Sequence, residues 1–213
     1  MMKQVIWDWN GTLLNDLRYS IDVRNRAFPA LGLPTIDSLD EYHQQFTFPV
    51  RSYYERAGVT DENFVQVAHA WMDEYVRGFD TVELHPDVLE TLERFERAGL
   101  RQLVLSATKR DMLEDQIRRF PIRHFFYDVL GLGDIYAGSK EDIGRAYLQN
   151  CGIAPEETVM LGDTLHDADV ARAIGANCVL IARGHQSRAT LETSGYPVLD
   201  TLSQAADYVL AAR

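Results

Sequence analysis

The stretch Val5-Ile6-Trp7-Asp8-Trp9-Asn10-Gly11-Thr12-Leu13 decides the fold of this chain. Its apolar first half predicts a buried strand, and Asn10-Gly11-Thr12 predicts a turn. A lone carboxylate is costly to bury, so we expect Asp8 at the carboxyl end of the strand, where open α/β sheets bind ligands. The small residues that follow let backbone N–H groups approach an anion. The stretch therefore indicates a nucleophile beside a phosphate site, although Asn-Gly is also common in ordinary β-turns.

Beyond residue 85, predicted strands and helices alternate. Strands are expected at 102–105, 126–130, 158–161 and 178–181, and helices at 110–119, 139–150, 167–174 and after Ser203. A further helix is expected to carry Pro86 at its first position and to close at Gly99. Repeated strand–helix units of this kind predict a parallel sheet with helices on both faces.

The segment between the first strand and this alternating region shows helical patterns only. Apolar residues recur at helical spacing over 16–31 and 60–79, and Ser38 and Pro49 are typical helix starts. We therefore predict an α/β fold with a parallel-sheet, Rossmann-like core of residues 1–15 and 81–213 and an all-helical cap of residues 16–80. The aromatic residues of this segment are expected to pack inside it rather than on a ligand: Tyr53, Tyr54, Phe64, Trp71, Tyr75 and Phe79.

Composition and charge narrow the class of protein. The chain of 213 residues has 21 Lys and Arg against 32 Asp and Glu, and its net charge is -11. This acidic excess argues against sequence-independent binding to nucleic acid or to an anionic membrane surface. No apolar run approaches the length of a membrane span or resembles a secretory signal, and Cys151 and Cys178 lack metal-ligand spacing. We expect a cytoplasmic monomer or homodimer with reduced thiols.

Polar side chains occur where the predicted strands end. Ser106 follows the second strand, and Asp163 and Asp167 follow the fourth. Because the carboxyl ends of parallel strands share one edge of the sheet, we expect these side chains to meet Asp8 and Asn10 there. Three crowded carboxylates need a cation, and Mg²⁺ suits such a set of oxygens together with a substrate phosphate.

The phosphate itself needs positive charge and N–H donors. Lys140, in the first turn of a predicted helix, is the side chain that we expect to supply the charge, together with Ser106 and backbone N–H groups. Lys109 is the alternative, since it lies three residues beyond Ser106.

These residues together resemble a known family. Asp8-x-Asn10-Gly11-Thr12, a strand ending in Ser106, a downstream Lys140 and Gly162-Asp163-x-x-x-Asp167 are similar to the motifs of the haloacid dehalogenase (HAD) superfamily, in its phosphoglycolate-phosphatase-like branch with a helical cap. The resemblance covers most of the chain. It implies a Mg²⁺-dependent phosphomonoester hydrolase that acts on a small phosphorylated metabolite through an aspartyl-phosphate.

The resemblance also implies a role for each motif residue. Asp8 would be the nucleophile and a metal ligand, Asp163 a metal ligand, and Asp167 a ligand or its support; the backbone carbonyl of Asn10 would bind the metal too. Arg51 follows a cap segment similar to the substrate-specificity stretch of related enzymes, so it would meet a substrate anion, unless it is an ordinary surface arginine. The phosphate would be held by Gly11, Thr12, Ser106, Ala107 and Lys140.

Asn10 departs from the family pattern, in which phosphatases carry an Asp here as general acid and base. An amide cannot carry a proton between those steps, a role typically worth about 10²–10⁴-fold in rate. Several explanations stay open: a slow phosphatase that favours good leaving groups, a non-catalytic or regulatory protein that binds phosphate esters, a proton supplied by His166, or deamidation of Asn10. Carbon–halogen hydrolysis is disfavoured, because it needs no metal-type loop at Asp163 and Asp167.

Overall fold

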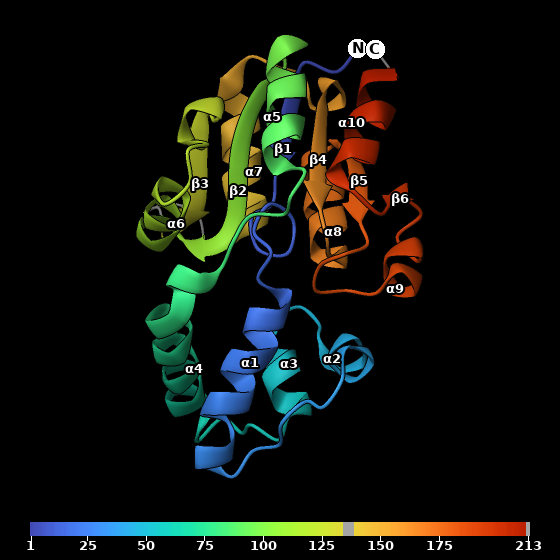
Figure 1. The fold of residues 1–213 in the computed structure, drawn as a ribbon. Helices are drawn as coiled ribbons and strands as arrows, with labels where there is room; N and C mark the ends of the chain where they lie inside the picture. Colours follow the sequence, from blue (N-terminus) through green and yellow to red (C-terminus); the bar gives the residue numbers. More distant parts are fainter. Residues whose placement is uncertain (134–138, 212–213) are drawn as a thin grey trace.

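The computed structural model describes residues 1–133 and 139–211, and its fold is an α/β core with a helical cap (Figure 1). The core sheet has six strands in the spatial order β3-β2-β1-β4-β5-β6, and all neighbouring strands pair in parallel. In chain order the strands are β1 (Gln4–Trp7), β2 (Arg101–Lys109), β3 (Asp128–Leu132), β4 (Thr158–Gly162), β5 (Asn177–Ile181) and β6 (Val198–Leu199).

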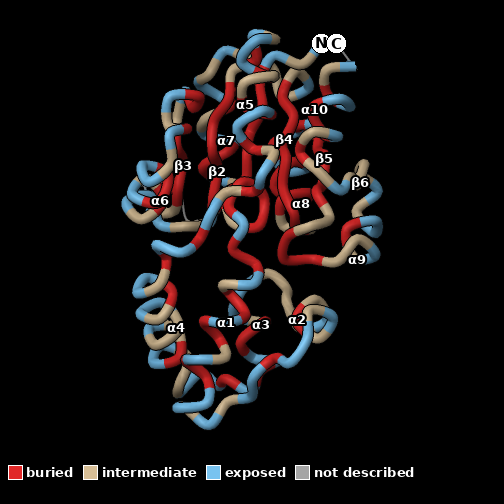
Figure 2. The backbone as a smooth tube through the Cα atoms, viewed as in Figure 1, coloured by how far each residue is buried: buried red, intermediate tan, exposed pale blue. Residues whose placement is uncertain are grey.

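Helices cover both faces of this sheet. Val5 and Trp7 of β1 pack into one hydrophobic cluster and Ile6 packs into another, as expected for a strand that is buried on both sides. Figure 2 shows the central strands buried along their length. The first cluster includes side chains of α5 (Val88–Arg97), α6 (Arg110–Arg118) and α10 (Leu202–Ala211), and the second includes side chains of α7 (Lys140–Cys151), α8 (Leu165–Ile174) and α9 (Arg188–Glu192).

The cap is inserted between β1 and α5 and lies beyond the carboxyl ends of the strands, opposite the chain termini (Figure 1). It has a hydrophobic cluster of its own, built around Phe28, Tyr42, Tyr54 and Val67. Two chain segments connect it to the core, so it is placed to cover that edge of the sheet. Its helices are α1 (Leu17–Ala27), α2 (Leu39–Gln45), α3 (Val50–Arg56) and α4 (Phe64–Gly78).

The structure confirms the parallel-sheet core and the all-helical cap after the first strand, and it corrects several boundaries. The first cap helix ends at Ala27, because Pro29 begins a separate 3₁₀ turn. Pro86 is not a helical residue, since α5 begins at Val88. Strand β2 continues past an irregularity in its pairing with β3, so Ser106 lies within the strand rather than after it. Helix α9 and strand β6 were not predicted. The exact division between core and cap stays a prediction.

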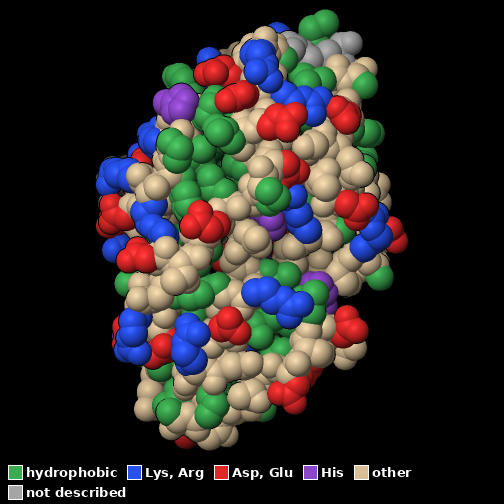
Figure 3. Space-filling model, viewed as in Figure 1, with side chains coloured by type: hydrophobic (Ala, Val, Ile, Leu, Met, Phe, Trp, Pro, Cys, Tyr) green, Lys and Arg blue, Asp and Glu red, His purple; other side chains and the backbone are tan. Residues whose placement is uncertain are grey.

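The face of the molecule in view carries no large basic patch. There, Lys and Arg side chains alternate with Asp and Glu (Figure 3). In residues 1–133 and 139–211, every helix is too short or too polar to cross a membrane. Cys151 and Cys178 are both free thiols. A cytoplasmic location and a monomeric or homodimeric state stay predictions.

Candidate active site

A cavity of about 580 Å³ lies between the carboxyl edge of the sheet and the cap. Its core wall includes Asp8, Ser106 and Lys140, and its cap wall includes Tyr53 and Trp71. The parallel topology therefore brings together side chains that are far apart in the sequence, as predicted for the edge of an open α/β sheet.

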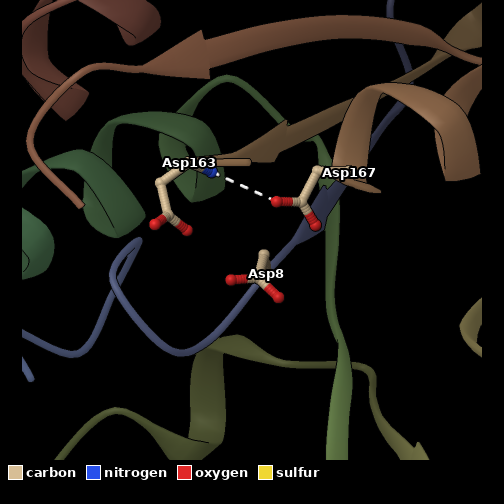
Figure 4. Close-up of side chains that lie close together, drawn as sticks. All are labelled: Asp8, Asp163 and Asp167. Carbon is tan, nitrogen blue, oxygen red and sulfur yellow. Dashed lines mark hydrogen bonds between the residues drawn. The ribbon is translucent and has the colours of Figure 1, made fainter. Parts of the chain in front are cut away.

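Three buried carboxylates meet at one end of this cavity. Asp8 follows β1, Asp163 follows β4, and Asp167 lies in the first turn of α8. One oxygen of each lies within 4.8 Å of an oxygen of the others, and Figure 4 shows the three side chains converging. Burial, reinforced by the neighbouring carboxylates, raises the pKa of Asp8 to about 8 and that of Asp163 to about 6.

Lys140 is the cation of this cluster. Its Nζ donates to Oδ1 of Asp8 at 2.5 Å and to Oδ1 of Asp167 at 2.6 Å, and its side chain is 2% exposed. Burial alone would lower the pKa of Lys140, but the two carboxylates outweigh it and raise that pKa. Burial likewise opposes ionisation of Asp167, yet Lys140 and the hydrogen bonds of its carboxylate hold its pKa below the usual value. Lys109, the alternative, has an exposed side chain and lies 3.5 Å from Asp111.

Local structure fixes the other two carboxylates. Asp167 accepts from the backbone N–H and the hydroxyl of Thr164, so it is part of the capping box that begins α8. Asp163 accepts from the Thr12 hydroxyl at 2.8 Å and from the backbone N–H of His185 at 2.6 Å. Gly11 has φ +75°, and a Cβ there would collide with the Asp163 carboxylate, so glycine is required at this turn.

This donor set fits a divalent cation. Carboxylate oxygens are the ligands that Mg²⁺ prefers, and the structure packs three carboxylates against one ammonium group, which leaves an excess of negative charge in a buried place. Burial is the main cause of the raised pKa values of Asp8 and Asp163 and the neighbouring carboxylates add to it, so a bound cation would favour the ionised form of both.

Asn10 uses both ends of its amide in hydrogen bonds to protein groups. Its Nδ2 donates to Oδ2 of Asp16 at 2.8 Å and to the hydroxyl oxygen of Tyr75 at 3.1 Å. Its Oδ1 accepts from the hydroxyl of Thr108 at 2.8 Å. The side chain therefore faces the cavity as a fixed amide that joins the nucleophile loop to β2 and to the cap.

Asp16 and His185 are two site residues to which the sequence assigned no role. Asp16 is 1% exposed and accepts from the backbone N–H of Gly11 at 2.8 Å, while His185 Nε2 lies 3.3 Å from its Oδ1. Burial disfavours a charged His185, but Asp16 and Asp163 outweigh it and raise the His185 pKa to about 9. As an imidazolium it donates to Asp16 and to the Tyr42 hydroxyl, at 2.7 Å. The available signals were weak: an Asp before a helix and a His in a loop after a strand.

The other sequence candidates divide into those that reach the cavity and those that do not. Ser106, Ala107 and Thr108 line it at the end of β2, and Thr12 is buried beside Asp163. His166 also lines it and stacks on Phe48, with ring centroids 4.7 Å apart; burial lowers its pKa.

Arg51 does not line the cavity. It lies on the exposed face of α3 and pairs with Glu55 and Asp61. The aromatic residues of the cap have two roles rather than the single role that we predicted. Tyr53 and Tyr54 belong to the cap cluster and also line the cavity, whereas Phe79 packs into the core.

A helical cap over the carboxyl edge of a parallel sheet, with an acidic cluster and a lysine between them, defines a capped α/β protein with a Rossmann-like core. The sequence pattern of the haloacid dehalogenase-like hydrolase family matches residues 5–181, and this chain belongs to that family. Within it, the chain falls in the phosphoglycolate-phosphatase-like branch of phosphatases.

Individual relatives agree with this assignment. The phosphoglycolate phosphatase of Aliivibrio fischeri is 24% identical over 224 residues, which cover 99% of this chain and 96% of the relative. That of Synechococcus elongatus is 24% identical over 190 residues, covering 89% and 88%. The structure of a haloacid dehalogenase-like hydrolase from Streptococcus pneumoniae matches with a TM-score of 0.86 at 21% identity, over 98% of both chains.

Proposed function

We propose that this protein is a Mg²⁺-dependent phosphomonoester hydrolase that acts on a small phosphorylated metabolite, with Asp8 as its nucleophile. One observation carries the proposal: the Asp8 carboxylate faces the cavity with the Lys140 ammonium group 2.5 Å away and two further buried carboxylates beside it. Membership of a phosphatase branch supports the same class of reaction.

In the first step, an oxygen of Asp8 forms a bond to phosphorus, and the ester P–O bond breaks. Its electron pair leaves with the alcohol oxygen, which is then protonated from water. Water hydrolyses the resulting aspartyl-phosphate and regenerates the carboxylate. Lys140 offsets the repulsion between Asp8 and the phosphoryl oxygens, and the end of β2 at Ser106 and Ala107 lines the place where those oxygens would lie.

The metal would be held by Asp8, Asp163 and the backbone carbonyl of Asn10, with Asp167 as a ligand or as the support of Lys140. When bound, Mg²⁺ would neutralise charge between the phosphate and the carboxylates.

The amide of Asn10 sets the expected rate. It has no proton to give to a leaving group, and its Nδ2 and Oδ1 are engaged by Asp16, Tyr75 and Thr108. We therefore propose a slow phosphatase that depends on the quality of its leaving group. A non-catalytic protein that binds phosphate esters is the alternative, and it shares every feature of the site except turnover.

The test is phosphate release from a panel of small phosphomonoesters, with and without Mg²⁺, for the wild type and Asp8→Asn. We expect Mg²⁺-dependent release by the wild type and none by Asp8→Asn. Release that persists in Asp8→Asn would refute the role of Asp8. A silent wild type that still binds phosphate analogues would refute the hydrolase and leave the binding protein.

A further inference from the structure

The wall that the cap contributes to the cavity is aromatic. The cavity, about 580 Å³, falls within the range of about 300–1,000 Å³ that is usual for pockets that enclose a small organic ligand. Beyond the phosphate end, a ligand there would contact mainly ring surface. The cap side chains that form this wall include Phe46, Phe48, Tyr53, Tyr54, Phe64 and Trp71.

Three tyrosine hydroxyls at this wall are engaged by protein partners. The hydroxyl of Tyr53 accepts from Nη1 of Arg24 at 2.8 Å. That of Tyr75 donates to Asp16 at 3.0 Å, and that of Tyr42 lies 2.7 Å from Nδ1 of His185. What these side chains offer to a ligand is therefore ring surface rather than a polar group.

The cavity has little to offer a second anionic group on a substrate. Among the described residues that line it, Lys140 is paired with Asp8 and Asp167, and His185 with Asp16. The third lining cation, Lys109, is 70% exposed and lies near Asp111. Two arginines of the cap that do not line the cavity are engaged by other groups: Arg24 bonds to Tyr53 and Gln45, and Arg51 pairs with Glu55 and Asp61.

The amide of Asn10 also restricts the substrates, through the leaving group of the ester. Because its amide cannot protonate a leaving group, that group must depart with its own charge, and a weaker base departs more easily. A phenol, with a pKa near 10 as in tyrosine, is a far better leaving group than an alkyl alcohol, whose acidity is close to that of water at about 15.7.

We infer that the substrates of this site are small aryl phosphates, monoesters of an uncharged aromatic alcohol, and not carboxylated esters such as phosphoglycolate. This inference rests on the proposed function, because it assigns the group that occupies the cavity once the phosphate is at Asp8. The aromatic wall would stack on the ring, and Asn10 would tolerate the phenolate that leaves.

Binding separates this inference from the proposed function. Phenylphosphonate, methylphosphonate and phosphonoacetate are stable analogues, and their affinities in the presence of Mg²⁺ can be measured by calorimetry on the whole protein. We expect phenylphosphonate to bind about tenfold or more tightly than the other two. Equal affinities, or a preference for phosphonoacetate, would overturn the inference even if phosphoesters are hydrolysed.

Two cap variants test the wall itself. Phe48 is half-buried and stacks on His166, so Phe48→Ala should weaken phenylphosphonate about three- to tenfold and leave methylphosphonate unchanged. Val50→Arg places a cation at the wall, on a side chain that is 40% exposed, and should tighten phosphonoacetate several-fold. The matched control Val76→Arg, at an exposed cap valine away from the cavity, should change neither affinity. If Val50→Arg and Val76→Arg have the same effect on the affinity for phosphonoacetate, the aromatic wall does not select between ligands.

Turnover supplies the remaining comparison. For the wild type, kcat/KM should be higher for phenyl phosphate than for 2-phosphoglycolate and for glycerol phosphate. A phosphotyrosyl peptide shares the aryl ester, and faster hydrolysis of the peptide than of phenyl phosphate would overturn the assignment to a small molecule. Failure to hydrolyse any ester, with the preference for phenylphosphonate intact, would refute the hydrolase and not the aromatic selectivity.

Discussion

Replacing Asn10 by Asp, the residue that phosphatases of this family usually carry, is expected to add an acid to the site and to destabilise the fold in a pH-dependent way. In the wild type, Nδ2 of Asn10 donates to Oδ2 of Asp16 at 2.8 Å. Asn10→Asp puts a carboxylate oxygen at that place. Two like charges 2.8 Å apart repel by about 6 kcal/mol at an effective dielectric constant of about 20. One of the two carboxyls must therefore keep its proton at neutral pH.

The magnitude follows from proton linkage. The carboxyl that keeps its proton in the folded state has a raised pKa there, whereas in the unfolded chain it ionises near pH 3.9. The free energy of unfolding therefore falls by about 1.4 kcal/mol for each pH unit above that value. For Asn10→Asp, the loss in free energy of unfolding should be about 1–2 kcal/mol at pH 5 and up to about 4 kcal/mol at pH 7. The retained proton is a general acid, so kcat for alkyl phosphates should rise by about 10²–10⁴-fold.

Urea denaturation at pH 5, 6 and 7 measures the loss of stability, and phosphate release measures the gain in kcat. Asn10→Ala is the control, since it removes the same hydrogen bonds without adding a charge, and its stability loss should not change with pH. The double variant Asn10→Asp with Asp16→Asn exchanges acceptor and donor and should regain most of the stability. A stability loss for Asn10→Asp that is the same at pH 5 and pH 7 would contradict the predicted repulsion between the two carboxyls.

Three other predictions concern buried charge. Lys140→Met leaves Asp8 and Asp167 without their cation, so the metal-free protein should lose about 3–5 kcal/mol of stability at pH 7, seen as a lower urea midpoint; an unchanged midpoint would contradict the ion pairing. Binding of Mg²⁺ should release close to one proton from the protein at pH 7, because the pKa of Asp8 is about 8 without the metal. Calorimetry in two buffers with different ionisation enthalpies counts the released protons. A count near zero would refute the raised pKa of Asp8. His85 Nε2 lies 3.1 Å from the Gly11 carbonyl oxygen, and burial together with Arg183 lowers the pKa of His85 to about 4. Above that pH His85 is neutral in the folded protein, whereas in the unfolded chain it gains a proton near pH 6.5. Its contribution to stability should therefore fall by about 3 kcal/mol in all between pH 6.5 and pH 4, and His85→Gln should remove that part of the slope.

The sequence predicted every strand of the sheet except β6, because these strands contain short apolar runs, and β1 and β4 are each followed directly by an aspartate. Asp8 and Asp163 could be placed at one edge from topology alone, since parallel strands leave no other arrangement. Lys140 could be assigned only by its order among the motifs, and the structure places its ammonium group against Asp8.

What the sequence could not show were contacts made across the cap. Asp16 was interpreted only as a helix start, and His185 had no assigned role, because their pairing depends on how a loop of the core meets the cap. Arg51 was a candidate because of its neighbours in the sequence, with an ordinary surface arginine as the equal alternative. The direction of a helix face is set by tertiary packing, and Arg51 pairs with Asp61. The same limit applied to the aromatic residues, whose spacing fits a cap core and a cavity wall equally well.

Hydrogen bonds between the cap and the core loops couple the position of the cap to the geometry of the site. Asn10 donates to the Tyr75 hydroxyl at 3.1 Å, Tyr42 bonds to His185, and His43 lies 3.2 Å from the Gly184 carbonyl. The same loops orient the Gly11 turn and the Asp163 carboxylate. At about 0.5–1.5 kcal/mol for each hydrogen bond, separating the two parts costs a few kcal/mol and also frees the acidic residues to move. A cap that moved away from the core to admit a ligand would therefore also loosen the site, and its return would restore the arrangement of these residues.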